Sequence, residues 1–254
     1  MSTMTFERRR TAQSELLSRD DFRARLEETL HDNLTLSHPI FTLLLDESNP
    51  RPVLLRHVAL QGYQLTKHFL SYIEHIYFYC PIPKHKRLLL NNLYEEETGK
   101  FSKTKNHVRL MEDFLAAIGV TREDIDVVEP LPATRELIDY RLDAVKDVDK
   151  YHIGAAAVTI ASEGQNLETL GQEPRHNMFE RVYGLTEKDL LFFSVHQKED
   201  IGHTQQGLDL VADFCTTQDL QEEAVYAVDH TCKLFYAMYE GIYQEFVVKQ
   251  GIDC

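Results

Sequence analysis

The chain has 254 residues, of which 43% are hydrophobic and 27% charged, and its formal net charge is −14. This length supports one large core, and the negative mean charge argues against nucleic acid as a partner. No window approaches twenty apolar residues without a charge, and the polar, basic first ten residues contain no apolar signal region, so we expect a cytoplasmic protein with no membrane span. No C-x-x-C pair occurs, and we expect the first three of the four cysteines to be buried thiols; the four are Cys80, Cys215, Cys232 and Cys254.

Apolar residues recur at the helical spacing i, i+3, i+4 throughout, and alternating runs typical of strands are nearly absent. The sequence therefore predicts an all-α protein, with a flexible N-terminal segment over residues 1–18 and one helical domain over residues 19–254. Residues 46–52, D-E-S-N-P-R-P, form a clear break. Helices are expected at about residues 19–33, 38–45, 53–79, 86–98, 107–118, 134–147, 151–170, 187–212 and 218–248.

The sharpest motif is H-Q-K-E-D-I-G-H, from His196 to His203. At about 100° per residue, Asp200 lies about 40° from His196, and His203 lies about 20° from it on the other side. Three side chains that bind metals therefore share one stripe of a helix. Imidazole and carboxylate are ligands for iron, manganese or zinc, and the absence of a thiolate favours iron. A solvated polar face is the alternative interpretation of the same spacing.

Glu163 follows a helical run of small and apolar residues, A-A-A-V-T-I-A-S. A carboxylate in such a helix would be buried, and a buried carboxylate needs a partner or a metal ion. The alternative is a glutamate at a helix end that reaches water beside Gly164.

The third motif is the acidic run Glu95, Glu96 and Glu97, which precedes His107. In an unbroken helix Glu96 and His107 would lie within about 20° of each other. Gly99 could instead end the helix and Asn106 could cap a new one, and phasing then cannot choose among the three glutamates.

Together, three helices offer three imidazoles and three carboxylates, which is what a carboxylate-bridged pair of metal ions requires. In these stretches the chain resembles the heme-oxygenase-like diiron oxidases and oxygenases, and it is more distantly similar to pyrroloquinoline quinone synthase and thiaminase II. The resemblance covers roughly residues 36–243. Its motifs are L-L-L-N-N-L-Y-E-E-E-T-G at 88–99, N-H-V-R-L-M at 106–111, A-S-E-G-Q at 161–165 and H-Q-K-E-D-I-G-H at 196–203.

The resemblance implies a single seven-helix bundle that holds two Fe(II) ions and uses dioxygen as co-substrate. The implied ligands are Glu96, His107, Glu163, His196, Asp200 and His203, with Glu163 as the catalytic bridging carboxylate. The segment between Glu96 and His107 is about one helical turn longer than in several relatives. Glu97 therefore remains an alternative first ligand.

The resulting expectation is a non-heme diiron oxidase or oxygenase that desaturates, hydroxylates, N-oxygenates or cleaves a small metabolite, such as an amino-acid or fatty-acid derivative. The alternative is a metal-free oxidase of the pyrroloquinoline quinone synthase type. The chlamydial member of the group draws on its own tyrosine and lysine for aminobenzoate synthesis. Phe41 and Glu173 stand at the corresponding positions here, which argues against that reaction.

Three side chains on the long helix that precedes the first ligand helix are candidates for substrate binding: Tyr63, Lys67 and His68. Packing would also explain each of them. No G-x-G-x-x-G motif for a nicotinamide or flavin occurs, so electrons come from the substrate or from an external reductant. A homodimer is compatible with the sequence, as is a non-enzymatic binding protein that meets its partner through the acidic surface.

Overall fold

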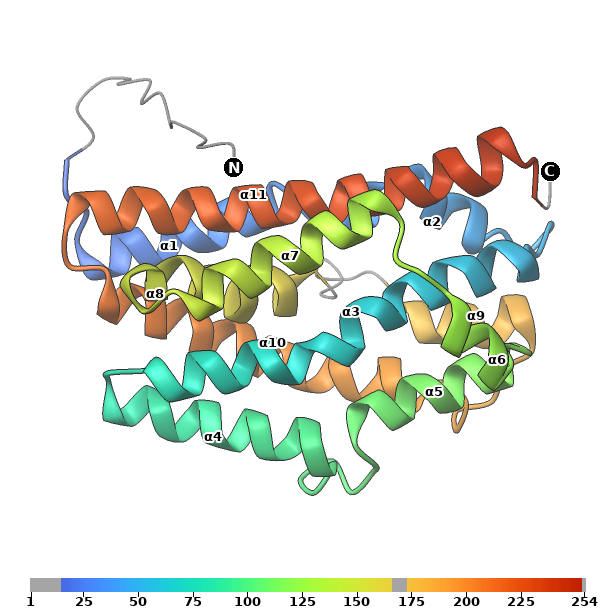
Figure 1. Ribbon diagram of the computed structural model, residues 1–254, viewed down its shortest axis with the longest axis horizontal. Coiled ribbons are helices and arrows are strands. Elements are labelled where there is room, and N and C mark those ends of the chain that lie inside the picture. The colour runs from blue at the N-terminus through green and yellow to red at the C-terminus, as the bar shows by residue number, and fades with distance from the viewer. Residues whose placement is uncertain (1–14, 166–172, 253–254) are drawn as a thin grey trace.

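The computed structural model describes residues 15–165 and 173–252, and within them the regular elements are all helical. The predicted all-α class is therefore confirmed (Figure 1). The α-helices are α1 (Arg19–His31), α2 (Pro39–Leu44), α3 (Pro52–Tyr79), α4 (Pro83–Thr98), α5 (His107–Ala117), α6 (Arg122–Val127), α7 (Pro132–Lys146), α8 (Tyr151–Ala155), α9 (Arg175–Tyr183), α10 (Leu191–Phe214) and α11 (Gln218–Ile242). A count of seven is not confirmed, because the described residues form eleven α-helices, several of them short. Residues 1–14 of the expected N-terminal segment lie outside the described residues, as does Cys254.

Local chemistry sets most helix ends where the sequence predicts them. The Ser18 hydroxyl caps α1 by accepting a hydrogen bond from the Asp21 backbone N–H, and the break at residues 46–52 separates α2 from α3. Two short helices, α6 and α9, were not expected. The expected start of α10 near residue 187 is wrong: Thr186 and Asp189 close a turn through reciprocal hydrogen bonds, and the helix begins only at Leu191.

The most apolar helix of the sequence lies at the centre of the molecule. After α8 it continues as a π-helical segment, Ala156–Ser162, and this π segment packs between α10 and α11. Every residue from 154 to 165 is buried. The contact with α10 is close at Gly207, where an added Cβ would lie 2.2 Å from the Thr159 carbonyl oxygen. Only glycine permits this approach of the two backbones.

Two apolar clusters fill the interior, and the long helices run through both. In α10, Phe192 and Phe193 pack against one cluster, whereas Leu208, Leu210 and Val211 belong to the other. The stripe of His196, Asp200 and His203 lies between them along the helix. The fold therefore places the candidate ligands in a polar zone enclosed by apolar packing.

Asp213, near the end of α10, ties three elements together. Its carboxylate accepts hydrogen bonds from Arg19 at 2.6 Å and His85 at 2.7 Å and pairs with Lys84 at 2.5 Å. Burial would raise the pKa of Asp213, but these hydrogen bonds outweigh burial and hold the pKa well below its usual range.

The prediction of buried thiols is confirmed for Cys80, Cys215 and Cys232. Among the described helices, none combines the length and apolar character needed to cross a bilayer.

Candidate metal centre

The stripe on α10 presents one imidazole that is already oriented by its own helix. The Nδ1–H of His196 donates to the Phe192 carbonyl at 2.6 Å, since a carbonyl oxygen can only accept. This hydrogen bond leaves the Nε2 lone pair available, and Nε2 lies 4.0 Å from Glu96 Oε1. Burial lowers the pKa of His196 to about 4, so the ring is neutral near pH 7, as a metal ligand must be.

Glu163 comes directly after the π segment and has the burial that the sequence predicts, with 3% of its surface exposed. Isolated π-helical turns occur frequently at functional sites because they shift the register of the side chains that follow. Glu163 Oε1 accepts a hydrogen bond from Asn92 Nδ2 at 3.0 Å and lies 3.7 Å from His203 Nδ1. Burial raises the pKa of Glu163, and the nearby His203 opposes this shift.

The chain breaks between the first two candidate ligands, so helical phasing does not bring them together. Gly99 ends α4 in the left-handed region with φ of 60°, and the Asn106 side chain caps α5. His107 is the first residue of α5, and its Nδ1 lies 3.0 Å from Glu96 Oε1. Burial would raise the pKa of Glu96, but the imidazole of His107 beside it outweighs burial and lowers the pKa.

The three neighbouring glutamates have different surroundings. Glu97 is exposed and accepts a hydrogen bond from Asn106 Nδ2 at 3.2 Å. Glu95 is buried and accepts hydrogen bonds from the backbone N–H groups of Phe101 and Ser102, so it holds the loop between α4 and α5. Glu96 is the one that faces both His107 and His196.

The six candidate ligands divide into two triads. The first triad is Glu96, His107 and His196, and the second triad is Glu163, Asp200 and His203; in each, one ligand atom per residue lies within 4.8 Å of the others. Neither ring nitrogen of His107 makes a well-aligned hydrogen bond, and neither does His203 Nδ1. Buried polar atoms of this kind need a partner, and carboxylates with imidazoles form a donor set that suits iron. The residues therefore fit a pair of metal ions.

Two further polar residues support this centre and were not identified from the sequence. Asn92 holds Glu163, and it lies one helical turn before Glu96, a spacing that could have indicated it. Glu199 Oε2 lies 3.9 Å from His107 Nε2. Glu95 Oε1 lies 3.6 Å from the same nitrogen. Carboxylates beside the second nitrogen of a ligating histidine commonly fix its tautomer and orientation. Glu95, His107 and Glu199 also form a third group with metal-binding spacing.

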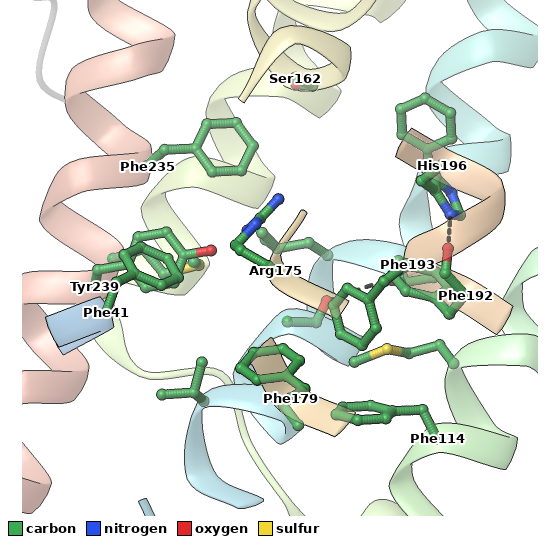
Figure 2. A pocket seen from close by; sticks show the side chains of 18 of the residues that line it. Phe41, Phe114, Ser162, Arg175, Phe179, Phe192, Phe193, His196, Phe235 and Tyr239 are labelled. Atoms are coloured by element: carbon green, nitrogen blue, oxygen red, sulfur yellow. Dashed lines mark hydrogen bonds between the residues drawn. The ribbon is translucent and has the colours of Figure 1, made fainter. Parts of the chain in front are cut away.

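A cavity of about 160 Å³ opens beside the two triads and includes Glu96, Glu163 and His196 in its wall. The remainder is mostly apolar, and Figure 2 shows aromatic rings from several helices around it. Small-molecule sites typically combine apolar walls with a few placed polar groups. The aromatic residues in the wall are Phe41, Phe69, Phe114, Phe179, Phe192, Phe193, Phe235 and Tyr239.

The structure does not bring Tyr63, Lys67 and His68 to this cavity. The Tyr63 hydroxyl pairs with Glu112 at 3.0 Å, and Lys67 is exposed. Helix α3 turns Leu65, Thr66 and Phe69 toward the cavity instead. A role for the three predicted residues in substrate binding therefore has no support from this geometry and stays a prediction.

The fold and the two triads define a helical bundle with a buried candidate metal centre. A family model described as an iron-containing redox enzyme matches residues 56–236 of the chain, which is more than half of it. The chain belongs to this family of iron-containing redox enzymes. The expectations of an enzyme, of iron and of oxidoreductase chemistry are confirmed at this level.

Among known proteins, the chain is similar to 4-aminobenzoate synthases. It is 25% identical to the one from Nitrosomonas europaea over 240 residues, which cover 91% of this chain and 94% of the relative. It is 23% identical to the one from Chlamydia muridarum, with 73% of this chain and 75% of the relative covered.

Solved structures confirm the heme oxygenase-like fold. A TenA homologue from Pseudomonas syringae pv. tomato superposes with a TM-score of 0.70 at 18% identity, covering 94% of this chain and 99% of the homologue. A domain with a heme oxygenase-like fold from Shewanella denitrificans gives a TM-score of 0.65 at 19% identity, with 93% and 96% covered. At these identities the likeness concerns the fold alone.

Proposed function

We propose that the chain is a non-heme diiron enzyme that uses dioxygen to oxidise a small metabolite. The observation that carries the proposal is the pair of triads beside one cavity, in a member of an iron-containing redox family. Glu96, His107 and His196 would hold one ion. Glu163, Asp200 and His203 would hold the other, with Glu163 as the catalytic carboxylate between the two sites.

When bound, two ferrous ions would supply two electrons to dioxygen, and the substrate or an external reductant would supply the others. The protein supplies the geometry. The Nδ1–H of His196 is held by the Phe192 carbonyl, and Asn92 holds one oxygen of Glu163, so both ligand atoms are oriented before an ion arrives. The aromatic wall of the cavity excludes water from the reacting atoms. The product is a desaturated, hydroxylated, N-oxygenated or cleaved metabolite.

The substrate of this proposal is an external molecule rather than a side chain of the protein. Phe41 lies in the cavity wall, packed edge to face on Tyr239 with ring centroids 4.8 Å apart, and it offers no phenol. Glu173 is exposed and pairs with Arg181. These two positions correspond to the tyrosine and lysine that the chlamydial member of the group uses, and neither residue here can take over that chemistry.

Anaerobic titration of the metal-free protein with Fe(II), followed by exposure to dioxygen, tests the proposal. We expect two tightly bound ions per chain and consumption of dioxygen. His203→Ala should lose one ion, and Glu163→Gln should lose the reaction with dioxygen. Glu97→Gln is the matched control, because this exposed neighbour of Glu96 faces away from the triads. A wild-type chain that binds no iron, or a His203→Ala variant that keeps two tight ions, would contradict the proposal.

A further inference from the structure

Arg141 is a buried cation on the apolar face of α7. It stands at helical spacing among Leu137, Ile138, Ala144 and Val145, all of which are buried, and only 2% of its own surface is exposed. Arginine is almost never fully buried unless it is paired with an anion. The position of this residue therefore requires an explanation beyond packing.

The partners of Arg141 within the described residues are all uncharged. Nε donates to the Leu137 carbonyl at 3.2 Å, and Nη1 donates to the Ser162 hydroxyl at 3.2 Å. The guanidinium also lies over the rings of Tyr72 and Phe235, at 4.6 and 5.3 Å from their centroids. Nη2 makes no hydrogen bond. Burial lowers the pKa of Arg141, the Tyr72 hydroxyl opposes this shift only in part, and no described carboxylate offsets the cost of removing this charge from water.

The cavity beside the triads supplies the space for the missing anion. Arg141, its partner Ser162 and Phe235 all belong to the cavity wall, and Ser162 directly precedes Glu163. The wall contains two carboxylates, Glu96 and Glu163, and both belong to the triads. Figure 2 shows a second cation, the guanidinium of Arg175, between the rings of α11 and the side of the cavity that carries His196. Outside the triads, the charged side chains in this wall are therefore the two arginines.

We infer that Arg141 binds the carboxylate of the substrate, and that the substrate class is a small organic acid with an apolar body. The planar guanidinium fork matches a carboxylate, and the free Nη2 with Nη1 offers it neighbouring donors. The apolar wall accommodates the rest of the molecule. The inference rests on the proposed function for the reaction, but the binding step itself needs no metal. Because Arg141 donates to Ser162, the residue directly before Glu163, the carboxylate end of a bound acid would lie nearest the second triad.

Calorimetric titration of the metal-free protein at pH 7 with benzoate, benzyl alcohol and phenyl phosphate tests this inference. Charge-assisted hydrogen bonds to a buried cation predict that benzoate binds about tenfold or more tightly than the neutral alcohol. Arg141→Gln should bring that ratio close to one. Arg135→Gln is the matched control on the same helix, because Arg135 lies outside the cavity wall and is half exposed.

The comparison of probes on the wild-type protein stands even if Arg141→Gln fails to fold. Equal binding of benzoate and benzyl alcohol by the wild type would overturn the inference, as would phenyl phosphate binding more tightly than benzoate. A preference for benzoate that is lost in Arg175→Gln and kept in a folded Arg141→Gln variant would also overturn it. Iron titration of the same preparation separates carboxylate binding from the proposed diiron function. A protein that binds iron but shows no preference for benzoate refutes only the inference about Arg141. A protein that prefers benzoate but binds no iron refutes only the proposed function.

Discussion

Gly207 sets the distance between α10 and the π segment, and substituting it should loosen the metal centre. In Gly207→Ala the new Cβ would lie 2.2 Å from the Thr159 carbonyl oxygen and 2.6 Å from its hydroxyl oxygen. Backbone atoms cannot rotate away, so the two helices must separate by roughly 1 Å. Gly202→Ala is the matched control, since this glycine lies on the same helix and an added Cβ meets nothing within 4 Å.

The two substitutions should change stability in opposite directions. Overpacking of this kind costs about 1–3 kcal/mol, and the gain in helix propensity, up to about 1 kcal/mol, offsets it only partly. For a chain of this size each kcal/mol corresponds to about 2–4 °C in Tm. We therefore expect Gly207→Ala to melt several degrees lower and Gly202→Ala to melt slightly higher, as measured by circular dichroism.

The same separation should weaken iron binding. His203 lies one turn before Gly207, and Glu163 lies one turn after Thr159, so parting the helices moves the second triad apart. Anaerobic Fe(II) titration should show the second ion bound about tenfold more weakly in Gly207→Ala and unchanged in Gly202→Ala. If Gly207→Ala is as stable as Gly202→Ala and binds two ions as tightly, the close contact does not exist and this reasoning is refuted.

Three other substitutions test separate parts of the structure. Asn92→Ala removes the hydrogen bond to Glu163 and should weaken iron binding about 10- to 100-fold in the same titration, and an unchanged affinity would contradict this role. Glu95→Gln leaves a loop N–H without its acceptor and should lower the free energy of unfolding by about 1–3 kcal/mol in urea; equal midpoints would count against it. The pKa of Asp213 is depressed in the folded state. The stabilisation from this carboxylate is therefore fully present above its unfolded pKa of about 3.9, and it is lost as the pH falls from there through the folded pKa. Asp213→Asn should therefore cost about 1–3 kcal/mol at pH 7 and progressively less toward pH 2, whereas a gap independent of pH would refute the linkage.

Some features of the metal centre follow from the sequence because they are local. The period of an α-helix places His196, Asp200 and His203 on one stripe whatever surrounds them. The small and apolar residues before Glu163 predict its burial, since such a helix has no polar face to present to water.

Other features depend on contacts between distant segments. Gly99 breaks the helix that would have aligned Glu96 with His107, so the packing of α4 and α5 against α10 decides which of the three glutamates faces the histidines. The face of α3 that meets the cavity is likewise set by its neighbours, and it carries Thr66 and Phe69 rather than Lys67 and His68.

The sequence by itself determined the helical class, the break before the long helix, the stripe of ligands on α10 and the burial of Glu163. These features follow from periodicity and turn residues, which act over a few positions. Only the tertiary structure decided how the six side chains divide into two triads, because each triad joins helices far apart in the chain. It alone placed Arg141 against the cavity without an acidic partner among the described residues. The sequence shows that a charged residue among apolar residues on one helix face should be buried, but the packing of distant helices decides what that charge contacts.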